Sequence, residues 1–408
     1  MWLKRLAVTG VLLALAASVA AQETATVITD RTVYPVPEPP ELPKAGETFV
    51  DPTFGTTLMR VTDEGDGKQC QHVYSYYHTF NRDSTRFHIQ SGGKAMLYRF
   101  DPQAFRVLGK APLFAARPPG GGEPRWDDTL WSATDPDVAY CHTGLKLWEF
   151  NVATGKYTLI RDFAGTFEPG YIWQMSKSLD DGTFAFSLQD PKWHVVGFAA
   201  WKRDTDKVLI HEKANPGFDE VQLDKTGRYL VIKTGRQGRN KVIRVRVADL
   251  DTGKTWDLTD YEPDWAPGHS DNGHGTVVGM DAHTPRVTLR KLSDPHTFTT
   301  VLKWGDDWSQ GRHLSMLADD EGWVLISAYT GNKLKSNGLF RDEIMQAATD
   351  GSARVRRLCH HHSVVREYWE SPRANISRDG RFVCFTSNWG GSDRRDVFIL
   401  KVPKPDRP

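Results

Sequence analysis

The chain has 408 residues, with 52 lysines and arginines against 51 aspartates and glutamates, and its formal net charge is +1. A balance this even gives no support to a nucleic-acid partner or to a polybasic membrane contact. An acidic ligand would therefore have to be bound by a few local charges.

Residues 1–21 predict a secretory signal peptide. Lys4 and Arg5 precede an apolar run of about a dozen residues, which ends on small residues at Ala20 and Ala21. That run is too short to span a membrane, and no later stretch approaches the roughly 20 apolar residues that a spanning helix needs. We therefore expect a secreted or periplasmic protein without a membrane span.

Residues 22–55 form a proline-rich segment, with YPVPEPPELPKAGE at 34–47, which we expect to be extended on the surface. Residues 56–408 predict a single all-β domain. The chain contains 14 Trp, 19 Phe and 35 Gly, and its apolar runs are short and alternating, with few long helical stretches.

Seven weak repeats follow one another in this domain. Each combines a small polar residue, a turn such as Asp-Gly, an alternating strand and a second hairpin, as in NRDSTRFHIQSG (81–92), LDKTGRYLVIKTG (223–235) and ISRDGRFVCFTSN (376–388). A period of about 40 to 60 residues with four strands per unit is typical of a β-propeller. We predict a seven-bladed β-propeller with four-stranded antiparallel blades, in which TTLMRVTD (56–63) adds the outer strand that closes the ring. A pair of β-sandwiches with accidental similarity is the alternative.

The innermost strands of a propeller begin at one end of the central channel. The residues before the predicted turns therefore approach each other there, and many could bind a ligand: Tyr77, His78, Trp173, Gln174, Asp219, Glu220, His269, Asp271, His274, Arg312, His313, Arg373 and Asn375. Plain strand starts do not need such residues, which favours a functional site in the channel. The alternative is a wet channel whose polar groups bind only water.

Two kinds of chemistry could use the imidazoles and the amide or carboxylate oxygens at these positions. A divalent metal, Mn or Ca, could be bound by imidazoles together with amide or carboxylate oxygens, from His78, His269, His313, Gln174 and Glu220. Paired carboxylates such as Asp219 and Glu220 could instead hydrolyse a glycoside. Neighbours along a strand point to opposite faces, which counts against that pair.

Proton abstraction next to a carboxylate is a third chemistry. A His or Tyr would act as the base, and a nearby cation from Arg312, Arg366 or Arg373 would stabilise the charge that develops.

The segment CHHHSVVREYW (359–369) is predicted to cross the channel mouth before the last blade. Alternation can aim either His360 and His362 together, or His361 alone, toward the channel. Arg366, Tyr368 and Trp369 would then contact substrate. The alternative is a solvated loop in which Tyr368 and Trp369 pack over the blade interface.

The C-terminal part resembles a known family. EIMQAATDGSARVRRL (343–358), followed by HHHS and YWESPRANISRDGRFVCFTSNWGGSDRRDVFIL (368–400), is similar to the last two blades of exported bacterial propellers of the oligogalacturonate-lyase-like and TolB types. The resemblance implies β-elimination next to a uronic acid carboxylate, with a divalent metal held by His and Gln, or with His, Tyr and Arg as in other propeller lyases. The sequence departs from the family in lacking a clean Q-x-x-H-x-H run.

We therefore predict an exported, monomeric lyase that acts on an acidic polysaccharide or oligosaccharide. The predicted catalytic residues are His78, Tyr77, His269, His313, Arg312 and Arg373. The predicted substrate-binding residues are Trp173, Gln174, Glu220, His274, Arg366, Tyr368 and Trp369. The predicted metal ligands are His269, His313, His360 and His362. A non-catalytic propeller that binds a glycan or a periplasmic protein, and a glycoside hydrolase, are the alternatives.

Overall fold

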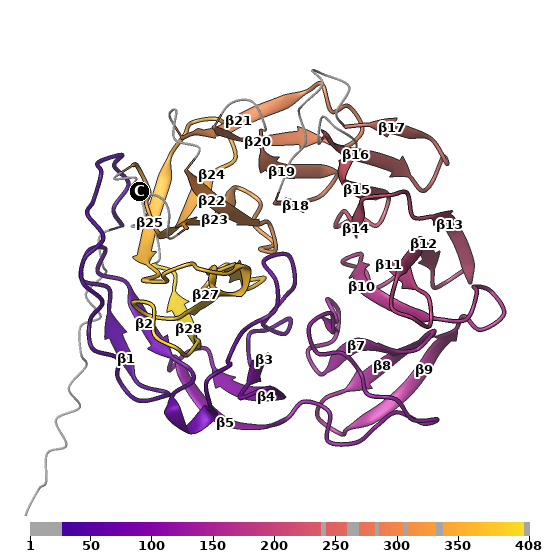
Figure 1. Ribbon diagram of the computed structural model, residues 1–408, viewed down its shortest axis with the longest axis horizontal. Coiled ribbons are helices and arrows are strands. Elements are labelled where there is room, and N and C mark those ends of the chain that lie inside the picture. The colour runs from indigo at the N-terminus through magenta and orange to yellow at the C-terminus, as the bar shows by residue number, and fades with distance from the viewer. Residues whose placement is uncertain are drawn as a thin grey trace, which may run out of the picture.

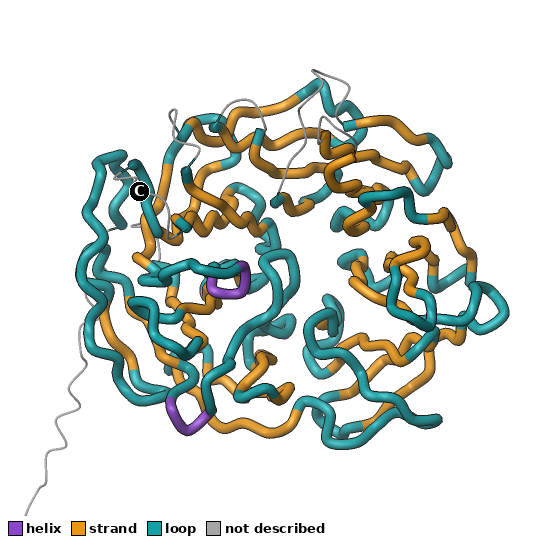
Figure 2. The backbone as a smooth tube through the Cα atoms, in the orientation of Figure 1, coloured by secondary structure: helices purple, strands orange, loops and turns teal. Residues whose placement is uncertain are grey.

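The computed structural model describes residues 27–237, 242–258, 269–281, 285–304, 309–331 and 338–403. Figure 1 shows β-sheets set as blades around a central axis, and Figure 2 shows that strands and loops make up nearly all of the chain. Within the described ranges there are seven sheets, of which five have four strands, one has three and one has five. The prediction of an all-β, seven-bladed propeller is confirmed.

The strands are numbered in chain order, and those of each blade are given from the axis outward. In blade 1 residues 71–80 take the inner position, and β3 is the first regular strand. Blade 1 contains β3 (Arg86–Ser91), β4 (Lys94–Asp101) and β5 (Arg106–Pro112). Blade 2 contains β6 (Leu130–Trp131), β7 (Val138–Thr143), β8 (Lys146–Asn151) and β9 (Lys156–Asp162). Blade 3 contains β10 (Tyr171–Lys177), β11 (Thr183–Gln189), β12 (Val195–Lys202) and β13 (Lys207–Lys213). Blade 4 contains β14 (Phe218–Leu223), β15 (Tyr229–Gln237), β16 (Val242–Asp249) and β17 (Thr255–Asp257). Blade 5 contains β18 (Ser270–Asn272), β19 (Thr276–Met280), β20 (Arg286–Lys291) and β21 (Phe298–Lys303). Blade 6 contains β22 (Gln310–Ser315), β23 (Trp323–Thr330), β24 (Glu343–Ala348) and β25 (Val355–His360). Blade 7 contains β26 (Asn375–Ile376), β27 (Phe382–Ser387), β28 (Asp396–Lys401), β2 (Thr57–Arg60) and β1 (Thr48–Val50).

Blade 7 closes the ring with strands from both ends of the chain. β2 pairs antiparallel with β28, with Met59 opposite Ile399, as predicted for residues 56–63. β1 extends the same sheet, so the propeller begins at Thr48 rather than at the predicted residue 56. Met59, Phe80 and Phe382 share one buried cluster, which packs blade 7 against blade 1.

Blade 1 has three strands because the chain before β3 does not form a regular inner strand. Residues 71–80 pair with β3 through isolated bridges, Gln71 with Gln90 and Phe80 with Phe87, and not through a regular ladder. This irregular segment occupies the inner position of blade 1 and leaves its side chains free to face the channel.

The predicted Asp-Gly turns connect the inner strands to the second strands. In blade 7, Ser377 donates a hydrogen bond to Asp379 (2.6 Å) and accepts one from the amide of Phe382 (3.0 Å). In blade 4, Gly227 has a φ of 75°, and a Cβ there would lie 2.7 Å from the Cβ of Ser178 in blade 3. Glycine at this turn thus allows the two blades to approach closely.

The helices of the described residues are short 3-10 turns, η1 (Glu64–Asp66) and η2 (Tyr368–Glu370). In these parts of the chain no helix has the length and apolar character needed to cross a bilayer.

The N-terminal segment runs along the outside of blades 6 and 7. Ile28 bridges to Arg357 of β25, Pro40 accepts a hydrogen bond from the indole of Trp389 (2.8 Å), and Pro43 accepts one from Arg60 (2.9 Å). The predicted extended segment is therefore packed against the propeller. The predicted signal peptide lies outside the described residues.

Arg357 is completely buried beneath this segment. Its guanidinium forms an ion pair with the buried Glu343 and has the rings of Tyr34, Phe54 and Phe340 at 4.5, 5.1 and 5.1 Å. Burial raises the pKa of Glu343 to about 7, even though Arg357 opposes this shift. The ion pair and its aromatic surroundings join the N-terminal segment to blade 6.

We expect Arg357→Met to lower the free energy of unfolding by about 3 to 5 kcal/mol at pH 8, because Glu343 would remain buried without its partner. The loss should be smaller at pH 6, where the carboxyl of Glu343 is protonated. Urea unfolding at both pH values measures this difference. Arg354→Met removes an exposed ion pair from the same hairpin and should leave the unfolding midpoint unchanged. Equal destabilisation by the two variants would contradict this account of Arg357.

Candidate functional site

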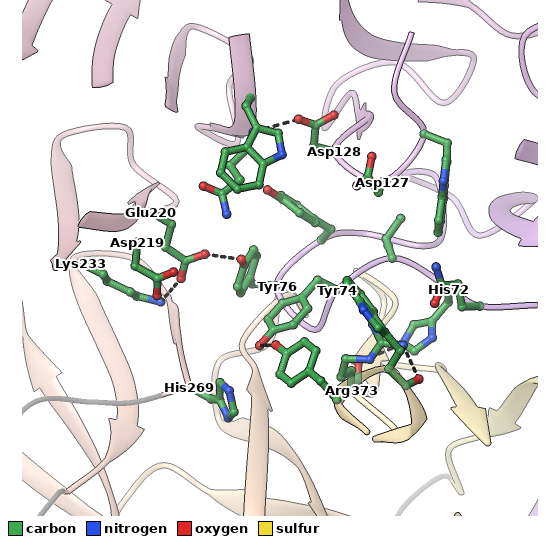
Figure 3. A pocket seen from close by; sticks show the side chains of 18 of the residues that line it. His72, Tyr74, Tyr76, Asp127, Asp128, Asp219, Glu220, Lys233, His269 and Arg373 are labelled. Atoms are coloured by element: carbon green, nitrogen blue, oxygen red, sulfur yellow. Dashed lines mark hydrogen bonds and ion pairs between the residues drawn. The ribbon is translucent and has the colours of Figure 1, made fainter. Parts of the chain in front are cut away.

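A cavity of about 720 Å³ lies on the axis, at the end of the channel where the innermost strands begin (Figure 3). Its walls come from the loop before β3, the loop before β6, the starts of β10, β14 and β18, and the loop before β26. The predicted convergence of these segments on one site is therefore present in the structure. The walls differ in chemistry around the ring.

Arg373 supplies a cation to one wall of the cavity. Its side chain is almost fully buried, and the guanidinium lies 4.8 Å from the centre of the Trp369 ring. It donates hydrogen bonds to the carbonyl oxygens of Ser371 and Trp369, each at 3.2 Å. Burial lowers its pKa to about 10, so it stays charged at neutral pH. Across the described ranges no carboxylate forms an ion pair with Arg373.

His269 lies at the start of blade 5, between the wall with Arg373 and the wall with Glu220 and Lys233, and presents a neutral imidazole. Its Nδ1 is 2.9 Å from the carbonyl oxygen of Arg312. Because a carbonyl only accepts, Nδ1 must carry the proton, and Nε2 keeps its lone pair. Burial lowers the pKa of His269 below its usual value. At neutral pH this side chain is therefore suited to accept a proton.

His313 lies behind His269. Their rings stack at 4.1 Å with an angle of 20°, and Tyr329 stacks on His313 at 5.2 Å. Neither ring nitrogen of His313 has a hydrogen-bond partner among the described residues, and burial lowers its pKa well below the usual range. His313 thus supports the ring of His269 by stacking.

Two tyrosine hydroxyl groups meet beside this stack. Tyr368 donates a hydrogen bond to Tyr74 at 2.5 Å, and its ring centre is 6.4 Å from that of His269. Burial raises the pKa of Tyr368, so it is protonated at neutral pH. A proton acceptor and a proton donor therefore lie near each other, next to the cation of Arg373.

The opposite wall is acidic. The Glu220 carboxylate forms an ion pair with Lys233 (2.7 Å) and accepts a hydrogen bond from Tyr76. Burial, and secondarily the charge of Glu220, raise the pKa of Asp219. Figure 3 shows this group across the cavity from Arg373.

Blades 2 and 3 contribute aromatic and amide groups to the cavity. Trp126 and Trp173 line it together with Gln174. The backbone amide of Gln174 donates to Asp128 (2.9 Å), and its side-chain oxygen accepts from Ser187 (3.2 Å). These contacts fix Gln174, which has a φ of 50°.

Eight of the predicted site residues line this cavity: Tyr77, Trp173, Gln174, Glu220, His269, Tyr368, Trp369 and Arg373. His78 lies deeper, in a narrower cavity of about 70 Å³ that also contacts Asp271 and Asn272. Burial lowers the pKa of His78 well below the usual range.

Three predicted residues point elsewhere. Arg312 packs its guanidinium on Trp304 at 4.1 Å, because it neighbours His313 on β22 and points to the opposite face. His274 follows the end of β18, is half exposed and pairs with Glu321 at 2.8 Å. Arg366 forms an ion pair with Glu370. The structure does not place these side chains in the cavity wall, which corrects the prediction for them.

The four predicted metal ligands do not converge. His269 and His313 are stacked, so their in-plane lone pairs run side by side and cannot meet at one ion. His360 and His362 are buried away from the cavity wall, against Phe54 and Trp389, with their ring centres 6.2 Å apart. No three His, Cys, Asp or Glu side chains in the described part of the chain are placed to hold a metal ion. The geometry of these four histidines therefore does not fit the predicted metal.

Some cavity residues were not predicted: Tyr74, Tyr76, His72 and Lys233. The first three lie in the irregular segment of blade 1, where the alternation of a regular strand does not apply. Lys233 lies on the second strand of its blade. A lysine directly after the apolar run LVI in LDKTGRYLVIKTG is a usable signal for it.

No family model and no curated protein matches the sequence. Among solved structures the chain is similar to an oligogalacturonate lyase from Vibrio parahaemolyticus, with 13% identity over 90% of this chain and 99% of that chain and a TM-score of 0.65. It is similar to an oligogalacturonate lyase in complex with manganese, with 13% identity, coverage of 90% and 98%, and a TM-score of 0.64. TolB from Acinetobacter baumannii matches with 11% identity, coverage of 82% and 79%, and a TM-score of 0.39. At these identities the likeness to the two lyases is one of fold: this chain and theirs share a propeller over nearly their whole lengths.

Proposed function

We propose that the protein is an exported polysaccharide lyase that cleaves a uronic-acid-containing glycan by β-elimination. The observation that carries the proposal is Arg373, a buried cation that faces the cavity without a carboxylate partner in the described residues. An unpaired buried charge is costly, and a substrate carboxylate would compensate it. The predicted signal peptide supports export, and two solved structures of similar fold are oligogalacturonate lyases.

In the proposed reaction the uronate carboxylate binds Arg373. Neutralisation of this carboxylate makes the neighbouring C5 proton more acidic, and the guanidinium stabilises the enolate-like charge that develops when the proton leaves. Nε2 of His269 accepts the C5 proton. The C5 electron pair then forms the C4–C5 double bond as the C4–O4 bond breaks.

The leaving O4 must receive a proton. Tyr368 is protonated at neutral pH, and its hydroxyl lies in the cavity wall in contact with the hydroxyl of Tyr74. We assign Tyr368 as the donor: its hydroxyl, which donates to Tyr74 in the free protein, would turn to give its proton to O4 and accept a hydrogen bond from Tyr74 instead. The aromatic faces of Trp126, Trp173 and Trp369 suit the apolar faces of sugar rings.

A glycoside hydrolase fits these residues less well. Glu220 is bound by Lys233 and Tyr76, and Asp219 is its neighbour in the chain. Two carboxyl groups that hydrolyse a glycoside stand about 5 to 9.5 Å apart, on either side of the glycosidic bond. Asp219 and Glu220 are adjacent in the chain and lie on one wall of the cavity, so they do not provide such a pair.

The test is ultraviolet absorbance of the conjugated product, with purified mature protein on a panel of uronic-acid polysaccharides and oligomers, with and without Mn or Ca. A rise on one substrate supports elimination and identifies the glycan. A flat trace from folded protein contradicts it. Reducing ends without absorbance would indicate a hydrolase, and binding without either product a non-catalytic propeller.

A further inference from the structure

Blade 3 carries a stacked aromatic pair at the outer end of its innermost strand. Tyr171 begins β10, and Trp193 lies in the turn between β11 and β12. Their rings are 4.1 Å apart with an angle of 9°. Trp193 is 57% exposed, more than any other large aromatic side chain in the described ranges. Its outer face is therefore available to a ligand.

The turn holds Trp193 in an unfavourable backbone conformation. Trp193 has a φ of 69°, which is uncommon for a residue other than glycine. Its amide donates to the carbonyl of Asp190 (2.9 Å), and the Asp190 side chain accepts from the amides of Lys192 (2.8 Å) and His194 (2.9 Å). An exposed indole held by a well-bonded turn has little rotational freedom to lose when it binds a ligand.

The pair is continuous with the cavity. The register of β10 is regular from Tyr171 to Trp173, which pair with Gln189 and Ser187. Tyr171 and Trp173 therefore lie on the same face of the strand, about 7 Å apart, with Tyr171 nearer the mouth. Trp173 lines the cavity. The next most exposed aromatic residues, Trp369 and Tyr368, also line it, so the exposed rings gather at this end of the channel.

A cation, Lys192, stands next to Trp193, and the Asp190 carboxylate of the same turn is bound by backbone amides and by His194 (3.2 Å). Lys192 and His194 flank Trp193 and are both exposed. Lysine is positively charged at neutral pH. The Lys192 ammonium can pair with one carboxylate of an acidic chain that stacks on Trp193.

We infer that Tyr171 and Trp193 form an outer subsite, which stacks on sugar rings of an acidic glycan where the chain leaves the cavity over blade 3. The inference rests on the proposed function for the class of glycan. It adds that the site holds a chain rather than a single sugar, and that the chain extends toward blade 3. The rings of the glycan would stack on the free face of Trp193, and one of its carboxylates would lie near Lys192.

The test compares a polymer with a short oligomer. We expect Trp193→Ala to lower the ratio of kcat/KM on polygalacturonate, or on whichever panel polysaccharide is cleaved, to kcat/KM on its trisaccharide by about threefold to tenfold. Trp193→Phe should restore most of the ratio. Phe298→Ala removes an exposed aromatic side chain from the outer strand β21 and should leave the ratio unchanged. A ratio that is equal in wild type and Trp193→Ala overturns the inference.

Affinity electrophoresis in gels containing the same polysaccharides separates this inference from the lyase proposal. If no product absorbs, retardation of the wild type that is weaker for Trp193→Ala and normal for Phe298→Ala still supports the outer subsite. Retardation that is the same for all three proteins overturns it, as does a wild type that binds none of the polysaccharides. Thermal unfolding of each variant identifies any that fails to fold. If Trp193→Ala does not fold, Trp193→Leu, which keeps an apolar side chain but has no aromatic face, takes its place with the same expected loss.

Discussion

Arg373→Met is expected to lower kcat/KM on the uronate substrate by at least about a hundredfold, without lowering the unfolding temperature. The guanidinium is buried, and in the described part of the chain its hydrogen bonds go to two carbonyl oxygens at 3.2 Å rather than to a carboxylate. Methionine removes a charge that is costly to bury and keeps much of the side-chain volume. What is lost is the interaction with the substrate carboxylate and with the charge that grows on it during proton transfer. Steady-state kinetics and thermal unfolding of the same preparation measure both effects.

Arg366→Met is the matched control. Arg366 lies seven residues before Arg373 in the chain and, unlike Arg373, forms an ion pair with a carboxylate of the protein. Arg366 binds the buried Glu370, and although burial opposes the shift, hydrogen bonds from Arg366 and others lower the pKa of Glu370 to about 2. Loss of the Arg366 guanidinium should destabilise the fold and change kcat/KM only slightly. Arg373→Lys keeps the charge without the planar fork, so we expect an intermediate loss of about tenfold. If Arg373→Met kept activity within about threefold of wild type, Arg373 would not be the group that binds the carboxylate.

The contrast between these two arginines shows where reading the sequence succeeded. The turn in SPRANISRDG fixed the start of the last inner strand, and Arg373 stands just before it. The same logic located Trp173, Gln174 and His269. Turn chemistry is local, so it can be recognised without knowing the rest of the fold.

Side-chain direction was less predictable, because alternation assumes an extended backbone. Gln174, His362 and Arg373 have φ values of 50°, 52° and 44°. A residue in the left-handed region reverses the expected direction of the side chains around it. These conformations depend on contacts that are distant in the sequence, such as the hydrogen bond from the amide of Gln174 to Asp128.

Packing at the interface of blades 6 and 7 determines where the side chains of the three consecutive histidines lie. His360 ends β25 and contacts Phe54 of the N-terminal segment, and the His361 imidazole bonds the carbonyl oxygen of Ala328 in β23 at 2.9 Å. The partners of these rings come from remote parts of the chain. Neither spacing nor periodicity within residues 358–369 contains that information.

His269→Ala should lower kcat by about a hundredfold to ten-thousandfold, the usual contribution of a positioned general base. The hydrogen bond to the Arg312 carbonyl fixes the tautomer with its lone pair on Nε2, and stacking on His313 fixes the ring. His274→Ala removes a half-exposed imidazole that pairs with Glu321 outside the cavity wall, and it should leave kcat unchanged. Single-turnover measurements on the identified substrate would separate proton transfer from product release. A His269→Ala enzyme within about threefold of wild type would exclude His269 as the base.

The pH dependence of kcat/KM gives an independent test of the same assignment. A base must be neutral in the free enzyme, and burial lowers the pKa of His269 below the ordinary value of about 6.5. Activity should therefore persist as pH falls from 8 to 6.5 and decline only below that value, as His269 becomes protonated. The donor must be protonated and Arg373 must be charged. Burial raises the pKa of Tyr368 and lowers that of Arg373 to about 10, so the alkaline decline should begin near pH 10, with loss of the Arg373 charge. Tyr368→Phe should lower kcat while leaving in place the acid limb and the alkaline decline that loss of the Arg373 charge causes. An acid limb at or above pH 7 in the wild type would contradict the buried, neutral imidazole on which the proposed mechanism depends.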